Sequence, residues 1–213
     1  MAAFAGLVNG LCQAHIIGVV WGGFLAKYML AVGIFILALG LGSLIPIRKN
    51  YLQHALIYQQ MSAAVLGIFG PWIILYAGTQ FPLPISGIIA ALSIFVLGFV
   101  GGMEFPLISE LTRLDSDSSF SFANLMSFDY AGMSLATLLF PLFLLRLFGV
   151  FPASIIACAI NLIVAAEILY YFKDQIIPKK IIVGLIALFG VGLLVFITVS
   201  GSLEELAGKW ITS

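Results

Sequence analysis

Long apolar stretches repeat along this sequence. A helix needs about 20 mostly apolar residues to cross the hydrocarbon core of a membrane. In lipid only helices and closed barrels satisfy all their backbone hydrogen bonds, and barrel strands show alternating segments of about ten residues. Because the stretches here are long and continuous, they predict helices that span a membrane.

The number of these stretches predicts an all-α fold, a polytopic membrane bundle of about seven transmembrane helices. We expect residues 1–213 to form a single transmembrane domain. The predicted helices cover about residues 3–22, 27–46, 55–77, 84–105, 129–149, 151–172 and 180–200. The segment 106–128 between the fourth and fifth helices is predicted to be the one long loop.

The charge content supports a bilayer as the surroundings of this chain. Charged residues make up 8% of the sequence and hydrophobic residues 62%, whereas a soluble domain carries roughly 25% charged residues. The formal net charge is zero, so no basic face predicts a nucleic-acid partner. Lipid is therefore the expected solvent for most of the surface.

Basic residues are distributed unevenly between the two sides of the predicted bundle. The loops after the second, fourth and sixth helices hold six of the nine basic residues. These six are Arg48, Lys49, Arg113, Lys173, Lys179 and Lys180. Because cytoplasmic loops are enriched in Lys and Arg, the N-terminus is predicted to be cytoplasmic.

Three acidic side chains, Glu104, Asp129 and Glu167, lie inside or at the ends of predicted helices. Ionisable residues in membrane segments are rare and often mark functional sites. All three fall near the cytoplasmic ends of their helices, so they are predicted to form an acidic pocket for a small cation or a proton. Tyr130, which follows Asp129, and Asn161 in the sixth helix complete the predicted ligand-binding set.

Each of these residues also has a structural interpretation. Asp129 fits the N-cap of its helix, where carboxylates are favoured by free N–H groups and by the helix dipole. Glu104 can pair with Arg113, and Glu167 can reach the interface or pair with Lys173. A lone amide such as Asn161 commonly bonds a neighbouring helix.

Known catalytic patterns are missing from the sequence. It contains no H-E-x-x-H motif, no P-loop and no set of Ser, His and Asp with buried partners. The two cysteines, Cys12 and Cys158, are far apart and lack metal-site spacing. We therefore expect no catalytic residue, no metal site and no cofactor in this chain, and we do not expect it to be an enzyme.

Four segments in fixed order carry a family resemblance. They are LALGLGSLIPIRK (37–49), FVLGFVGGMEFPLISEL (95–111), DYAGMSLATLLFPLFLLRLFG (129–149) and NLIVAAE (161–167). Together they resemble the membrane domain of bacterial membrane-bound spermidine synthase-like proteins. The positions that match the family pattern are Gly101, Gly102, Glu104, Pro106, Asp129, Tyr130, Gly132, Phe140 and Pro141. The chain departs from it at Gln59 and Gln60, where the family often has an acid, and at Arg146, where it often has Pro.

The resemblance implies a location in the bacterial inner (cytoplasmic) membrane. In many members an aminopropyltransferase domain follows the membrane domain, and this sequence shows no glycine-rich loop after a strand that would mark such a domain. The leading interpretation is a non-catalytic membrane subunit that anchors or assists a membrane or soluble partner protein and binds a small cation. The alternative is a small transporter for a cation such as a polyamine.

Overall fold

The computed structural model describes residues 1–46, 52–114 and 122–172, together with residues 184, 186 and 190. This part of the chain is helical and contains no strand, which confirms the all-α class. The elements are α1 (Ala2–Val20), α2 (Phe24–Ser43), α3 (Leu52–Gln80), α4 (Leu83–Gly102), α5 (Glu104–Leu114), α6 (Phe122–Leu139), the π-helical segment η2 (Phe140–Phe148) and α7 (Val150–Tyr171).

Six helical segments among the described residues are long and apolar enough to cross a membrane. They correspond to the first six predicted spans, with α4 and α5 running on as one segment and α6 and η2 as another. The seventh predicted helix, at 180–200, falls outside the described residues except for three positions. The structure thus supports six spans.

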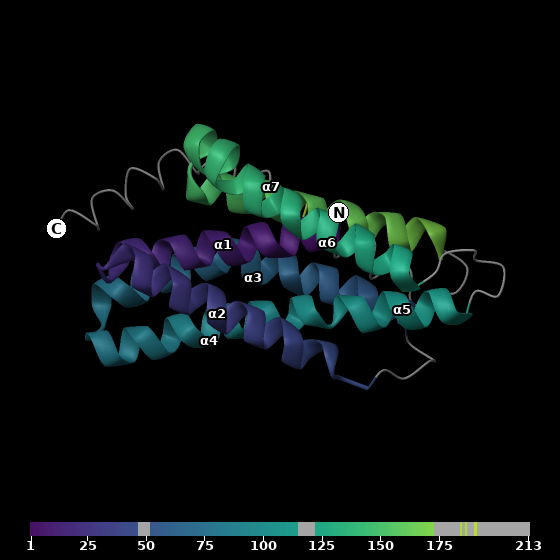
Figure 1. Ribbon diagram of the computed structural model, residues 1–213, viewed down its shortest axis with the longest axis horizontal. Coiled ribbons are helices and arrows are strands. Elements are labelled where there is room, and N and C mark those ends of the chain that lie inside the picture. The colour runs from purple at the N-terminus through teal and green to yellow at the C-terminus, as the bar shows by residue number, and fades with distance from the viewer. Residues whose placement is uncertain (47–51, 115–121, 173–183, 185, 187–189, 191–213) are drawn as a thin grey trace.

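Helix α1 lies at the centre of the bundle, in contact with α2, α3, α4, α6 and α7 (Figure 1). Its sequence is less apolar than that of α2, with a mean hydropathy of 1.6 against 2.2, and it contains Asn9 and Gln13. Both side chains are completely buried, so they face neighbouring helices rather than lipid. By contrast, α2 keeps most of its large apolar side chains exposed and α6 about half of them, as expected for helices that border lipid.

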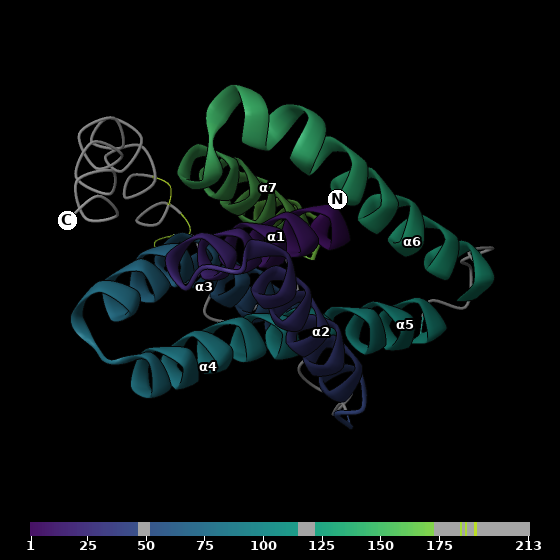
Figure 2. The same ribbon diagram turned by 60° about the vertical axis from the view of Figure 1, so that its left-hand side comes forward.

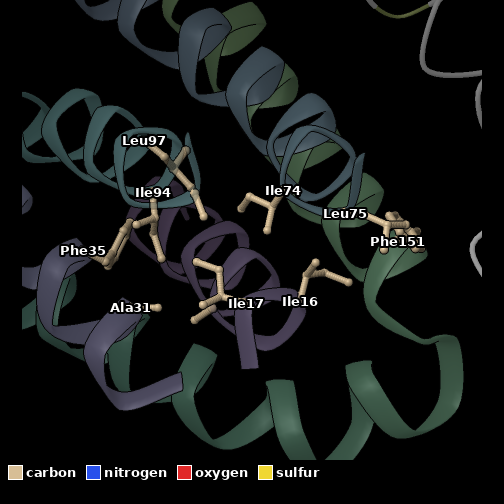
Figure 3. Close-up of a cluster of buried hydrophobic side chains, with 11 residues drawn as sticks. Ile16, Ile17, Ala31, Phe35, Ile74, Leu75, Ile94, Leu97 and Phe151 are labelled. Carbon is tan, nitrogen blue, oxygen red and sulfur yellow. The ribbon is translucent and has the colours of Figure 1, made fainter. Parts of the chain in front are cut away.

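The main apolar core joins α1 to four other helices (Figure 3). Ile17 of α1 packs there with Phe35 of α2, Ile74 of α3 and Ile94 of α4. Phe151 extends this cluster to α7, where its ring stacks on Trp72 with 4.2 Å between ring centroids. These contacts fix the relative positions of the helices that surround the site described below.

Glycines allow α2 and α4 to approach each other backbone to backbone. A Cβ atom at Gly98 would lie 2.6 Å from the Phe35 carbonyl oxygen, and one at Gly102 would collide with the Leu39 carbonyl oxygen. Gly42 of α2 is equally close to the backbone of Phe99. Small residues favour such close helix packing in lipid.

Pro71 lies inside α3, which runs from Leu52 to Gln80 as one helix of 29 residues. Proline has no N–H, so the carbonyl oxygen of Gly67, four residues earlier, loses its helical partner. The Ser154 hydroxyl of α7 donates a hydrogen bond of 2.6 Å to that oxygen. A neighbouring helix therefore satisfies the group that Pro71 leaves free, and α3 neither ends nor breaks there.

The prediction of one long loop at 106–128 is wrong for much of that segment. Helix α5 covers residues up to Leu114, and α6 already begins at Phe122. Within α5, Glu110 and Arg113 make an ion pair of 2.7 Å. On its other side Leu107 is buried against Leu52 and Leu56 of α3, so α5 is an amphipathic helix docked at the end of the bundle.

Candidate functional site

A cavity of about 340 Å³ opens at the end of the bundle where α1 begins. Its walls come from the first turns of α1, the C-terminal half of α2, the junction between α4 and α5, and α6. Helix α6 makes its main contacts with α1 and leans away from α2 and α4 (Figure 2). The cavity occupies the space that this arrangement leaves beside α1.

Glu104 lines the cavity from the first turn of α5. Helix α4 ends at Gly102, and α5 starts two residues later. Pro106 is tolerated as the third residue of α5 because N–H groups of the first turn have no partner within their own helix. A carboxylate in a first turn is also favoured by the helix dipole. The change of helix at Met103 thus turns Glu104 toward the cavity.

Asp129 and Tyr130 line the same cavity from α6. Gly132 lies nearly one turn after Asp129. A Cβ atom added to Gly132 would be 3.4 Å from the backbone nitrogen of Phe4, so α6 packs closely on the start of α1. The Tyr130 side chain is 58% exposed, so its hydroxyl is available at the mouth of the cavity. The N-cap interpretation of Asp129 is wrong, because α6 begins seven residues earlier at Phe122.

The two carboxylates interact electrostatically across the cavity. Like charges that share a partly buried site repel each other, and a bound cation removes that repulsion. Among the described residues Arg113 forms its ion pair with Glu110, so the predicted pairing of Glu104 with Arg113 is not formed. The amino group of Met1 is close enough to attract both carboxylates.

Gln60 of α3 approaches the Glu104 carboxyl from the bundle interior. Its side chain is 1% exposed, and within the described residues neither of its polar atoms makes a hydrogen bond of good geometry. Apart from Ser43, the remaining walls are apolar, with Phe35 and Leu39 from α2 and Met133 from α6. The cavity therefore combines negative charge with a surface suited to methylene groups.

Asn161 and Glu167 do not line this cavity, because they belong to α7, which packs on α1 and α3. Asn161 is buried inside the bundle. The Glu167 side chain is exposed, whereas Ala165 and Leu169, two positions away on either side, pack against α3. Of the five predicted site residues, the structure brings together Glu104, Asp129 and Tyr130.

The sequence interpretation did not include three groups that the structure places at or behind the cavity. The first is Gln60, which is not among the five predicted site residues. The others are Asn9 and Gln13 of α1. Their spacing of four residues places both on one face of a helix, and this was the available signal. Among the described residues, no group of three His, Cys, Asp or Glu side chains forms a metal site.

Comparison with known proteins finds two curated relatives with similar sequence identity to this chain. A polyamine aminopropyltransferase 1 from Streptomyces coelicolor is 24% identical over 194 residues, which cover 88% of this chain and 35% of the relative. A polyamine aminopropyltransferase from Leptospira interrogans is 25% identical over 167 residues, which cover 75% of this chain and 32% of the relative. The chain therefore spans about a third of the length of these relatives. No family model and no solved structure matches the sequence.

Proposed function

We propose that this helical bundle is a non-catalytic membrane unit of a polyamine-related system and that it holds an amine cation in the cavity between α5 and α6. The observation that carries the proposal is the position of Glu104 and Asp129. These two carboxylates come from different helices and line one cavity. The similarity to two proteins named polyamine aminopropyltransferases supports an amine as the ligand.

The chemistry of the cavity suits a linear aliphatic amine better than a metal ion. An ammonium group carries a positive charge and three N–H donors, which match carboxylate oxygens and the Tyr130 hydroxyl. The methylene groups of such a ligand gain from contact with Phe35 and Leu39. A polyamine offers both features in one molecule.

In this proposal the bundle lies in the bacterial inner membrane with the cavity open to the cytoplasm. It presents the amine, or anchors the machinery that uses it, next to an aminopropyltransferase on the same or another chain. The exposed apolar faces of α2 and α6 are available to lipid and to a partner within the membrane.

Direct binding of radiolabelled spermidine to the purified chain in lipid nanodiscs tests the proposal. We expect saturable binding by the unchanged protein and at least a tenfold weaker affinity for Glu104→Gln and for Asp129→Asn. Glu110→Gln is the matched control, because Glu110 is a carboxylate of α5 that pairs with Arg113 outside the cavity.

Two outcomes would reject the proposal. One is a folded protein that shows no saturable binding of spermidine or putrescine. The other is undiminished binding by the double variant with both carboxylates neutralised. Uptake of spermidine into proteoliposomes, lost in the same variants, would instead assign the cavity to a transporter.

A further inference from the structure

A row of polar side chains continues from the acidic cavity into the centre of the bundle. Gln60 of α3 lies beside Glu104, and Asn9 and Gln13 of α1 follow deeper inside. Asn9, Gln13 and Gln60 are each at most 1% exposed. Most polar side chains in a membrane helix face neighbouring helices, yet each buried polar atom still needs a partner.

The helices α3 and α7 fix the order of this row because they run antiparallel. The Cys158 thiol of α7 donates to the Ala64 carbonyl oxygen at 3.1 Å, and further along Ser154 contacts Gly67. Asn161 lies one turn from Cys158 and Gln60 one turn from Ala64, both toward the cavity. Asn161 and Gln60 are therefore level with each other, between Glu104 and Cys158.

Asn9 forms the next level of the row. Its Oδ1 atom accepts a hydrogen bond from the Cys158 thiol at 3.8 Å, and its side chain lies against Gly67, where a Cβ atom would collide with it. One turn deeper, Gln13 Nε2 donates to the Leu66 carbonyl oxygen at 3.0 Å. Gln13 Oε1 accepts from the Ser93 hydroxyl of α4 at 3.1 Å. The row thus reaches the middle of α4.

Several amide atoms along this row have no partner among the described residues. They are Asn9 Nδ2, Asn161 Nδ2 and both polar atoms of Gln60. A buried polar atom left unsatisfied costs about 1–3 kcal/mol. Buried water commonly fills such places when two to four polar groups surround it. In a bilayer that water has to enter from one end of the protein, and the cavity beside Gln60 is adjacent to the row.

We infer that the amide row of Gln60, Asn161, Asn9 and Gln13 is a hydrated branch of the acidic cavity, which carries a chain of water molecules to the middle of the membrane. The branch is a polar entry path for water and for small hydrogen-bonding solutes. This inference does not depend on which cation occupies the cavity, so its failure leaves the proposed amine site untouched.

The two native cysteines provide a test inside one unmodified chain. Both side chains are completely buried. Cys158 contacts Asn9 in the row, whereas Cys12 packs in an apolar cluster with Val8, Ala136 and Phe140. The reagent is 2-aminoethyl methanethiosulfonate, a small water-soluble cation that converts a thiolate to a mixed disulfide and releases methanesulfinate.

We expect Cys158 of the protein in nanodiscs to be modified at least tenfold faster than Cys12, as measured by peptide mass spectrometry of both sites in the same sample. A replacement of Gln60 by Leu closes the entry and slows modification of Cys158 at least fivefold, with no change at Cys12. Equal rates at the two cysteines, or no reaction at Cys158 in the folded wild-type chain, would overturn the inference. If the Gln60→Leu variant does not fold, the ratio of the Cys158 and Cys12 modification rates in the wild-type chain alone decides whether the inference holds.

Discussion

Ser154 of α7 donates its hydroxyl hydrogen to the Gly67 carbonyl oxygen of α3, the oxygen that Pro71 deprives of its helical partner. The contact links two helices that meet along most of their length. It also explains how α3 remains one helix of 29 residues despite an internal proline. An unsatisfied carbonyl at this depth has no access to bulk water, so the hydroxyl stabilises both the helix and the packing of α7.

This relationship predicts a coupling between Ser154 and Pro71. Ser154→Ala should lower the free energy of unfolding by about 1 kcal/mol, a typical value for a hydrogen bond between membrane helices. In the background of Pro71→Ala the same change should cost almost nothing, because the new N–H at position 71 can bond the Gly67 oxygen. Unfolding of the four proteins by SDS in mixed micelles measures the coupling. Equal costs in the two backgrounds would show that Ser154 acts independently of the proline.

Backbone contact between α2 and α4 gives a second prediction. Gly102→Ala places a methyl group against the Leu39 carbonyl oxygen, and a backbone atom cannot turn aside as a side chain does. We expect a loss of about 1–3 kcal/mol, the usual cost of overpacking. Gly40→Ala is the control, since no atom lies within 4 Å of a Cβ at Gly40. Thermal unfolding in one detergent compares the two, and similar midpoints would contradict the close α2–α4 contact.

The positions of the spans were predictable from the sequence, whereas the faces of the helices were not. Continuous apolar runs set the limits of six helices to within a few residues, apart from α6, because length and hydropathy suffice in lipid. A helix that is apolar on all sides gives no periodic signal for its buried face. For that reason the sequence grouped Glu167 and Asn161 with Glu104 and Asp129, although α7 turns Glu167 outward and Asn161 into the bundle.

The prediction of a long loop at 106–128 was wrong for a different reason. Its polar residues suggested a loop, but Leu107 packs against Leu52 and Leu56, which lie more than fifty positions earlier in the chain. Tertiary contact with α3 therefore supports α5, and no local pattern in the sequence reveals that partner. The early start of α6 likewise removed the capping role considered for Asp129.

Repulsion between Glu104 and Asp129 leads to a third prediction. Without a ligand, Glu104→Gln should raise the free energy of unfolding because it removes one of two like charges that share the cavity. Spermidine at about a hundred times its dissociation constant should stabilise the wild-type chain by about 2.7 kcal/mol, and the double variant Glu104→Gln, Asp129→Asn should show no such gain.

Thermal unfolding with and without spermidine measures both effects. Glu167→Gln is the control, since that carboxylate is exposed and does not line the cavity. A spermidine-dependent gain in the double variant equal to that of the wild type would mean that the amine binds elsewhere on the protein.

The orientation of the bundle is the last prediction. The cavity opens at the end where α1 begins, and Leu44, just after α2, lies at the same end and is 75% exposed. Gln80, the last residue of α3, is exposed at the opposite end.

The excess of Lys and Arg in the loops at the end with the cavity predicts that this end faces the cytoplasm. In intact cells a membrane-impermeant maleimide should therefore label Gln80→Cys and leave Leu44→Cys unlabelled until the cells are opened, with both variants made in a chain whose two native cysteines, Cys12 and Cys158, are replaced by alanine. The reverse pattern would place the acidic cavity on the outer side of the membrane, where it would meet external rather than cytoplasmic amines.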